Sequence, residues 1–318
     1  MRVSVIVPLY NKAPFIKRCL DSIAAQSFRD FEAIVVDDGS TDGGGAIAAA
    51  YPDARFRTIR QANAGPGAAR NCGIAEARGE SIAALDADDA WLPEYLDSSV
   101  RLLDARGPAV ASVTSVYVEY PRGRSWAPIW KARGVREGVQ KVTPQTPPVI
   151  LLHMLACMTP CTTVARASVV RRWGGFREDG CRYAEDAMLW LKVLLNETVS
   201  FQLEPLVHVH RDASGLSGNL SGPHPLEPFL ADPEEVERLC PPELRPLLRQ
   251  FYAIRASKTA AVWGYWGEWR EARQIFQRFV SARDWRLPFF AAGLAGSTPV
   301  ARLIGRACRL AKAVGSRE

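Results

Sequence analysis

Three features that would restrict the setting of this chain are missing from its sequence. The seven cysteines are odd in number and scattered, so no paired disulfide framework is visible and a reducing compartment is expected. No apolar run approaches the ~20 residues that a membrane-spanning helix needs. A strand-like segment, residues 3–7, begins near the N-terminus, so we expect no signal peptide. We therefore predict a cytoplasmic protein, with peripheral contact at the inner face of the cytoplasmic membrane as an open alternative.

Zinc-binding cysteines and a strong net charge are missing as well. Cys157 and Cys161 stand four apart and could share one helix face, but two thiols alone do not make a zinc site. The net charge of +6 is mild and no nucleic-acid-binding motif accompanies it, so we expect no nucleic-acid partner. Residues 281–318 hold seven Arg or Lys against two acids, which fits a contact with anionic lipid or a solvated helix surface.

The first half of the chain alternates short apolar runs with segments of helical periodicity. Strands are expected at residues 3–7, 31–36, 56–59 and 81–85, and helices at 42–50, 67–77 and 93–103. Buried strands separated by helices are typical of βαβ units, so the fold class is α/β with a mostly parallel sheet. Residues 120–148, rich in Pro, Gly and Arg, are expected to be a binding loop, a lid or disorder.

Composition divides the chain into three parts. Residues 1–215 form the α/β domain, with further elements expected at 162–165, 184–195 and 207–210. Residues 216–242 are Pro-rich and are predicted to be a linker. Residues 243–318 form a helical, aromatic and basic C-terminal region.

A basic amphipathic pattern stands out in that last region. Leu303, Ala307 and Leu310 share one helical face, while the basic side chains between 302 and 312 gather on another. The pattern predicts an interfacial helix on a membrane surface. A helix docked on the protein itself or on a second subunit would show the same amphipathicity.

Acidic residues cluster where two of the predicted strands end. Asp37 and Asp38 follow the second strand, and Asp86, Asp88 and Asp89 follow the fourth. Desolvated carboxylates are costly unless they are paired or bind a metal, and ligands of open α/β sheets bind at the carboxyl ends of the strands. On an extended chain Asp86 and Asp88 would point the same way and share one ion. The pattern predicts Mn²⁺ or Mg²⁺ holding a diphosphate.

Five ordered segments carry a resemblance to a known family. They read VSVIVPLYN at 3–11, VDDGSTD at 36–42, NAGPGAARN at 63–71, LDADD at 85–89 and YAEDAMLW at 183–190. Together, over roughly residues 1–217, they resemble the family 2 inverting glycosyltransferases of the GT-A fold. The resemblance implies transfer of one sugar from a nucleoside-diphosphate sugar donor to a hydroxyl of a glycan or lipid-linked acceptor. It also implies a role in cell-surface glycan synthesis.

The donor-binding residues follow from this resemblance. The second acid of the first pair, Asp38, is implied to bind the nucleotide base. The backbone at Pro8 and the side chain of Tyr10 would complete the base pocket. Arg70 would flank the sugar nucleotide, where its fork of donors suits phosphate oxygens.

The metal site is assigned in the same way. Residues 86–88 resemble the DXD motif, which makes Asp88 a metal ligand and Asp86 a contact of the diphosphate. Asp89 is expected to cap the next helix or to orient the site. Relatives carry an Arg-x-His element whose histidine corresponds to His210, so His210 is implied as a metal ligand and Arg211 as a substrate contact. This sequence has histidine where that arginine is usual.

The catalytic base implied by the family is the aspartate of a Glu-Asp pair, here Asp186. An inverting transfer needs one carboxylate that removes the proton of the attacking hydroxyl. Glu185 would contact the acceptor or orient the base. Each motif also has a structural explanation: turns and caps at 37–42 and 86–89, a helix N-terminal charge preference at 185–186, and a structural histidine at 210.

Two rival functions stay open on the sequence. A nucleotidyltransferase of related fold would carry a Gly-rich phosphate loop after the first strand, where residues 8–12 read PLYNK. A non-catalytic nucleotide-sugar-binding relative would be expected to lack Asp88 or Asp186, and both are present. The processive synthases of the family carry Gln-x-x-Arg-Trp and membrane spans, neither of which occurs, so a single-addition enzyme is favoured.

Overall fold

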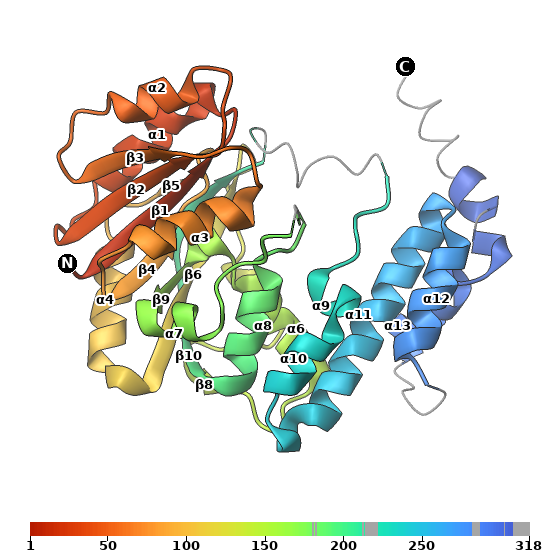
Figure 1. The fold of residues 1–318 in the computed structure, drawn as a ribbon. Helices are drawn as coiled ribbons and strands as arrows, with labels where there is room; N and C mark the ends of the chain where they lie inside the picture. Colours follow the sequence, from red (N-terminus) through yellow and green to blue (C-terminus); the bar gives the residue numbers. More distant parts are fainter. Residues whose placement is uncertain are drawn as a thin grey trace. The chain divides into compact units, whose positions relative to one another are not determined.

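The structure of the protein, a computed structural model, describes residues 1–179, 181, 183–211, 213, 222–281, 287–301 and 303–307. The chain divides into two compact units, and each is described by itself. The first unit comprises residues 1–142 and 153–218, and the second comprises residues 143–152 and 219–318. Figure 1 shows the course of the chain through both.

A ten-stranded sheet forms the centre of the first unit (Figure 1). Its strands are β1 (Val3–Leu9), β2 (Phe31–Asp37), β3 (Phe56–Arg60), β4 (Ser81–Ala84), β5 (Ala90–Trp91), β6 (Val110–Tyr120), β7 (Arg124–Ser125), β8 (Gly138–Lys141), β9 (Thr163–Arg166) and β10 (Thr198–His210). They neighbour one another in the order β3-β2-β1-β4-β9-β6-β10-β5, while β7 pairs with β6 and β8 with β10. Strands β1 to β4 pair in parallel, as do β6 and β10, whereas β9 runs antiparallel to both β4 and β6.

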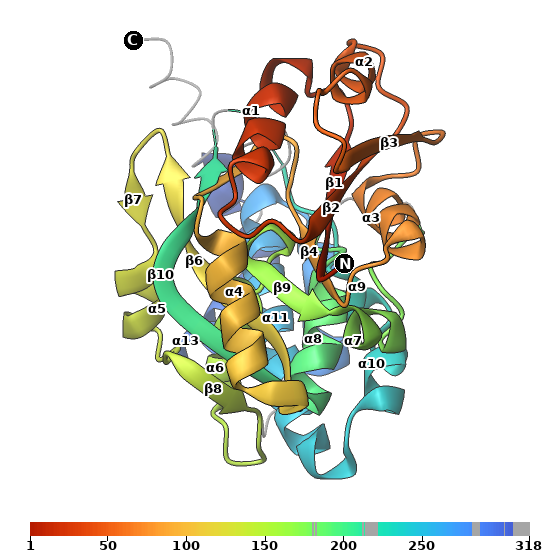
Figure 2. The ribbon, with the colours of Figure 1, turned by 90° about the vertical axis from the view of Figure 1, so that its left-hand side faces the viewer.

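Helices cover both faces of this sheet. Those with residues in the first unit are α1 (Ala13–Ala24), α2 (Gly44–Ala49), α3 (Pro66–Glu76), α4 (Tyr95–Ala105), α5 (Ala127–Ala132), part of α6 (Pro148–Cys157), α7 (Ala167–Arg172) and α8 (Ala187–Asn196), with 3₁₀ turns η1 (Gly107–Ala109) and η2 (Pro160–Thr162). On one face the end of α1 meets α4, where Leu96 N donates to Gln26 Oε1 at 2.9 Å. On the other, α7 meets the end of α3, where Arg171 donates to the Ala77 carbonyl at 2.8 Å (Figure 2).

The central strands are apolar because both of their faces are covered. Every residue of β2 is buried, and in β1 only Pro8 is partly exposed. Helix α3 packs directly on β1 at Gly73, where an added Cβ would lie 2.5 Å from Ile6 Cγ2. This close approach brings the first turn of α3 to the carboxyl ends of β1 and β2, which is where a ligand site is expected in a parallel sheet.

The predicted α/β class and the four strands of the first half are confirmed. The prediction for residues 120–148 is wrong, because this segment contains β7, α5 and β8. Trp130 of α5 is buried and lies edge-on against Phe201, with ring centroids 6.2 Å apart. Strand β8 pairs with β10. Tertiary contacts therefore fix elements too short to show a periodic pattern.

The proposed common helix face of two cysteines is also corrected. Helix α6 ends at Cys157, and Cys161 lies in the separate turn η2. The two residues consequently do not lie one helical turn apart. Both thiols are buried.

The second unit is helical in its described part. Its helices are α9 (Pro228–Ala231), α10 (Pro233–Leu239), α11 (Arg245–Trp266), α12 (Trp269–Phe279) and α13 (Leu287–Gly296), with the 3₁₀ turn η3 (Pro242–Leu244). Helices α11 and α13 meet at two glycines, since a Cβ on Gly264 would lie 2.1 Å from the Gly296 carbonyl oxygen. The buried Glu227 carboxylate pairs with Arg255 and accepts a hydrogen bond from Thr259 at 3.1 Å. Helices α9 and α10 lie within the stretch predicted as a linker, and the predicted domain boundaries stay predictions.

The predicted interfacial helix falls largely outside the described residues. The undescribed part includes Arg302, Arg309, Leu310 and Lys312. In the described part, Leu303 and Ile304 are 67% and 58% exposed. No helix among the described residues is both long and apolar enough to cross a membrane.

Candidate functional site

A cavity of about 550 Å³ opens in the first unit at the carboxyl ends of β1, β2, β4 and β10. All ten residues singled out from the sequence line it. They are Pro8, Tyr10, Asp38, Arg70, Asp86, Asp88, Glu185, Asp186, His210 and Arg211. The fold thus brings residues from the two ends of the first unit, from Pro8 to Arg211, to the same cavity. Their individual roles stay predictions. Four further residues line the cavity, although the sequence analysis assigned them no role in a site: Lys12, Asn63, Tyr117 and Cys161.

Arg70 is the buried centre of the site. It projects from α3, is 4% exposed, and pairs with Asp86 at 2.7 Å and with Glu185 at 2.6 Å. The guanidinium lies 5.2 Å from the centroid of the Phe176 ring. Its Nε–H is buried and has no hydrogen-bond partner among the described residues. A planar guanidinium can serve two carboxylates at once, which a lysine cannot do in the same geometry.

The chain that precedes Glu185 is held against α3 by a glycine and an asparagine of that helix. Gly67 permits the closest approach, because a Cβ there would lie 1.9 Å from the Arg177 carbonyl oxygen. Asn71 donates to the Phe176 carbonyl at 2.8 Å and accepts from the Phe176 N–H at 2.9 Å. These contacts fix the chain at Phe176 and Arg177, which precedes the Glu-Asp pair. Helix α3 therefore positions Glu185 both through the ion pair from Arg70 and through this preceding chain.

The acidic loop after β4 is a turn and not an extended segment. The Asp89 N–H donates to the Asp86 carbonyl at 2.9 Å, which reverses the chain. Asp86 faces Arg70, whereas Asp88 pairs with Lys12 at 2.6 Å. The expectation that Asp86 and Asp88 lie on the same side of an extended chain is therefore wrong. Burial and the neighbouring Asp86 raise the pKa of Asp88, and Lys12 partly offsets them.

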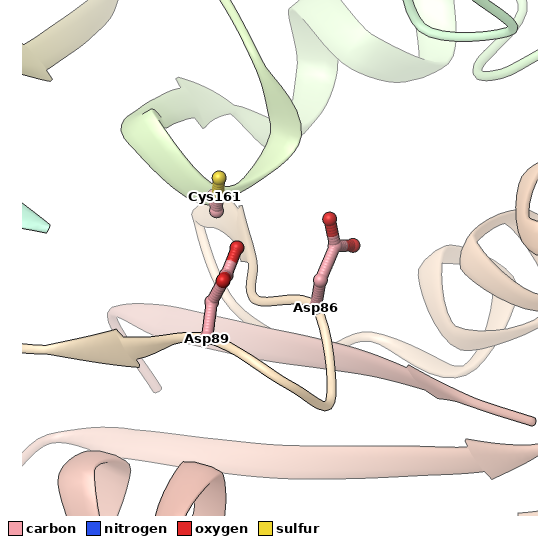
Figure 3. Close-up of side chains that lie close together, drawn as sticks. All are labelled: Asp86, Asp89 and Cys161. Carbon is pink, nitrogen blue, oxygen red and sulfur yellow. The ribbon is translucent and has the colours of Figure 1, made fainter. Parts of the chain in front are cut away.

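A third acid of this loop contributes to a different cluster. Figure 3 shows Asp86 and Asp89 directed toward η2, which carries Cys161. One ligand atom of each of these three residues lies within 4.8 Å of the others. Burial and the charge of Asp86 raise the pKa of Asp89 well above its usual value. Grouped, desolvated carboxylates are the setting that a divalent cation stabilises, so the oxygens of Asp86 and Asp89 fit Mn²⁺ or Mg²⁺, whereas the thiol of Cys161 is a soft ligand that does not.

Asp89 also fixes the end of β10. Its Oδ1 accepts a hydrogen bond from the His210 N–H at 2.8 Å, so it orients the site and does not cap α4, whose N-cap is Glu94. The His210 ring stacks on Tyr120 with centroids 5.2 Å apart. Arg211 pairs with Glu119 at 3.3 Å. The acidic loop and the end of β10 are consequently held together at the cavity.

Asp38 holds the loop that precedes α3. Its Oδ1 accepts hydrogen bonds from Gln61 at 2.8 Å and from the Ala64 N–H at 2.9 Å, and its Oδ2 accepts from the Gly65 N–H at 2.9 Å. Both oxygens are therefore engaged with protein donors, and Oδ2, which accepts one hydrogen bond, has acceptor capacity left. Tyr10 is 47% exposed at the cavity. The assignment of these residues to a nucleotide base stays a prediction.

Asp186 precedes α8 without capping it. No side-chain cap hydrogen bond is present, so helix capping does not explain this acid. Ala184, two residues earlier, has a φ of 53°, a left-handed conformation that is strained for a non-glycine residue. Burial, followed by the charge of Glu185, raises the pKa of Asp186 to about 7, with Arg70 opposing the shift. A carboxylate of this pKa can accept a proton near neutral pH.

Comparisons with known proteins agree with this geometry. A family model described as Glycosyl transferase family 2 matches residues 4–170. EpsJ of Bacillus subtilis, an uncharacterized glycosyltransferase, is 52% identical over 89 residues, covering 27% of this chain and 26% of EpsJ. The succinoglycan biosynthesis protein ExoO of Rhizobium meliloti is 44% identical over 110 residues, covering 34% and 32% of the two chains. The matched part is thus about a quarter to a third of the length of these relatives.

Solved structures share the fold. S. aureus TarS 1–349 matches with a TM-score of 0.64 at 20% identity, covering 98% of this chain and 92% of that one. The mannosyltransferase PcManGT from Pyrobaculum calidifontis, solved with GDP-Man and Mn²⁺, matches with a TM-score of 0.54 at 22% identity, covering 97% and 86%. At these identities the likeness concerns the fold alone. The predicted GT-A architecture is confirmed.

Replacement of Arg70 by methionine tests whether this residue holds the site together. Arg70→Met leaves Asp86 and Glu185 without their shared cation, so we expect a loss of about 2–4 kcal/mol in the free energy of unfolding. Urea-induced unfolding followed by tryptophan fluorescence measures it. The matched control is Lys17→Met, which breaks the exposed Lys17–Asp21 pair and should cost less than about 1 kcal/mol. Equal effects of the two variants would contradict the central role of Arg70.

Proposed function

Since the chain belongs to glycosyl transferase family 2, as its motifs predicted, we propose that it transfers a single sugar from a nucleoside-diphosphate sugar to an acceptor hydroxyl with inversion. The acceptor would be a glycan or a lipid-linked saccharide in cell-surface glycan synthesis. One observation carries the proposal: Arg70 draws the acidic loop and the Glu-Asp pair into one cavity, beside an aspartate with a pKa of about 7. ExoO, named for succinoglycan biosynthesis, supports the choice of glycan synthesis.

The donor would lie along the ends of β1, β2 and β4. Tyr10 and Pro8 offer the base an exposed aromatic face and a rigid backbone, and Asp38 offers acceptor oxygens for base N–H groups. Arg70, with an unpaired Nε–H, would donate to a phosphate oxygen. TarS has been solved with UDP-GlcNAc and PcManGT with GDP-Man, so the shared fold leaves the base of this donor open.

The residues that would hold a divalent cation come from the loop after β4 and from the end of β10. Asp88 and His210 are the proposed ligands and Asp86 the proposed contact of the diphosphate, and all three line the cavity. Asp86 also lies near Asp89 and Cys161. A bound cation would neutralise the charge that develops on the departing nucleoside diphosphate. PcManGT, solved with Mn²⁺, supports the choice of metal.

The reaction assigns one proton transfer to this chain. The acceptor oxygen attacks the anomeric carbon, the bond from that carbon to the diphosphate oxygen breaks, and the acceptor proton passes to a carboxylate oxygen of Asp186. A single displacement from the face opposite the leaving group inverts the anomeric centre. Glu185, fixed by Arg70, would hold the acceptor or keep Asp186 in place.

The two rival functions differ from this one in their products. Incubation with a nucleotide sugar and metal gives free nucleoside diphosphate if sugar transfer is correct. A nucleotidyltransferase acting on sugar phosphate and nucleoside triphosphate would release pyrophosphate, and a binding protein would release neither. A thermal-shift screen of nucleotide sugars with Mn²⁺ names the donor, because specific binding raises the stability of the native state.

Metal dependence is the first expected outcome. EDTA should abolish turnover, and Mn²⁺ or Mg²⁺ should restore it, because Asp88 is proposed to bind the cation. Asp88→Ala should weaken donor-plus-metal binding as well as the rate, as calorimetry would measure. Asp104→Ala, which removes an exposed acid of α4, serves as the control. Full activity after exhaustive chelation would contradict the metal assignment.

The second expected outcome concerns removal of the proposed catalytic base. Asp186→Asn keeps the shape of the side chain and removes its basicity, so turnover should fall about 10²–10⁴-fold with donor affinity nearly unchanged. In the wild type, the rate should rise with pH and level off above about 7, because the base acts only when deprotonated. The control, Asp179→Asn, changes an exposed acid paired with Arg177. A collapse of donor binding in Asp186→Asn would assign the residue to the donor site instead.

The third expected outcome is a peripheral membrane contact through the C-terminal region. Val300, Leu303 and Ile304 are exposed beside Arg306, which fits an interfacial surface. Each basic residue near an anionic leaflet contributes ~1 kcal/mol. The full chain should float with phosphatidylglycerol vesicles, and Leu303→Ser with Ile304→Ser should reduce flotation, whereas the exposed Ile47→Ser should not. Equal flotation of all three proteins would favour a helix docked on the protein or on a second subunit.

A further inference from the structure

A basic surface lies in the segment that the sequence predicted as irregular. Residues 121–136 contain five basic side chains and no acid. All five are exposed, and none forms an ion pair with a carboxylate of the described residues. The five are Arg122, Arg124, Lys131, Arg133 and Arg136. We call these side chains, together with Trp126, the basic patch.

Trp126 lies at the centre of the basic patch. The guanidinium groups of Arg124 and Arg133 each lie 5.7 Å from the centroid of its ring. The ring also packs on Tyr117, with centroids 5.2 Å apart and planes inclined at 31°. Tyr117 itself lines the cavity. An aromatic surface therefore continues from the cavity to the arginines.

A second, polar connection joins the basic patch to the cavity. Glu119 accepts a hydrogen bond from Trp126 Nε1 at 3.2 Å and pairs with Arg211 at 3.3 Å. Arg211 lines the cavity at the end of β10. Figure 2 shows β7 beside β6 and α5 beside β10; the basic patch lies on these two short elements and on the turns that flank them. The buried Trp130 anchors α5, so the basic patch rests on fixed elements.

The five basic side chains outnumber the neighbouring carboxylates Glu119 and Glu137, so they repel one another, and an anion brought among them reduces that repulsion. Arginine forks match phosphate and carboxylate groups, while an aromatic ring presents an apolar face to the C–H groups of a sugar. Resting on the function proposed above, we propose that the basic patch binds the acceptor. We further propose that the acceptor is an anionic glycan carrying phosphate or carboxylate groups.

A membrane surface is a less suitable occupant of the basic patch. Interfacial segments insert large apolar side chains beside their basic ones. No large apolar side chain of residues 121–136 is exposed, and Trp126 packs against Tyr117. The direct continuation from the basic patch to the cavity fits an acceptor chain whose reacting end must reach Asp186.

The test compares charged saccharide chains with neutral counterparts. The probes are a galacturonate hexamer and its fully methyl-esterified neutral form, with an oligomer of glycerol phosphate as the phosphate-bearing probe. Binding to the full chain is measured by calorimetry at low and high salt. Arg124→Ala with Arg133→Ala should weaken binding of a charged probe about tenfold and reduce its salt dependence. The charge-reversing pair Arg122→Glu and Arg136→Glu should weaken it further.

A matched control removes the same charge elsewhere. Arg101→Ala with Arg106→Ala changes two exposed arginines of α4 and its C-cap, and should leave binding of both charged probes unchanged. Nucleotide-sugar affinity, measured in parallel, should be equal in all variants. If the wild type binds no nucleotide sugar, the proposed function fails; if it does and only the probes fail, the inference about the acceptor fails alone.

Three results would overturn the proposal. Charged and neutral probes could bind equally, the control pair could weaken binding as much as the basic-patch pair, or neither charged probe could bind. A fourth result would assign the basic patch to a membrane: loss of binding to phosphatidylglycerol vesicles in the basic-patch variants, with no binding of either charged saccharide.

Discussion

The pairing of one buried arginine with two carboxylates is the constraint on which the site depends. Arg70 comes from α3, Asp86 from the loop after β4, and Glu185 from the approach to α8, 115 residues beyond Arg70. The arginine is buried, and the two carboxylates supply the opposite charge that its burial requires. The pairing therefore fixes both ends of the cavity at once. Gly67 and Asn71, on the same helix, position the chain that precedes the Glu-Asp pair, so α3 supports both the acidic loop and that pair.

In the acidic loop, three neighbouring carboxylates are held by different partners. Asp86, Asp88 and Asp89 lie within one turn, and each has a different partner: Asp86 pairs with Arg70, Asp88 pairs with Lys12, and Asp89 accepts a hydrogen bond from the backbone N–H of His210. The raised pKa values of Asp88 and Asp89 follow from burial that these partners do not fully offset. A divalent cation would complete the balance. Because Lys12 also donates to the Ala213 carbonyl at 2.6 Å, the first loop, the acidic loop and the chain after β10 are linked through one ammonium group.

Much of this could be read from the sequence because it is local. The apolar runs of β1, β2 and β4 and the acids that follow them are contiguous, and topology alone places such strand ends side by side. The pairing of Lys12 with Asp88, across 76 residues, leaves no mark in local periodicity. Nor does the position of Cys161 beside Asp89, because it depends on β9 entering the sheet antiparallel between β4 and β6. Residues 120–148 were misjudged for the same reason, since β7, α5 and β8 are stabilised by partners elsewhere in the chain.

The cavity residues and the basic patch differ in how strongly the rest of the fold constrains their side chains. At the proposed donor site, Asp38, Arg70 and Asp86 are held by hydrogen bonds and ion pairs, so substitutions there are expected to disturb the fold as well as ligand binding. By contrast, the basic patch consists mostly of exposed side chains, and it is connected to the interior through Trp126, which contacts Tyr117 and Glu119, and through the buried Trp130 of α5. Exposed arginines can be exchanged at little cost in stability. The proposed donor site is thus more constrained by the fold than the proposed acceptor surface, whose exposed arginines can change without disturbing the side chains of the cavity.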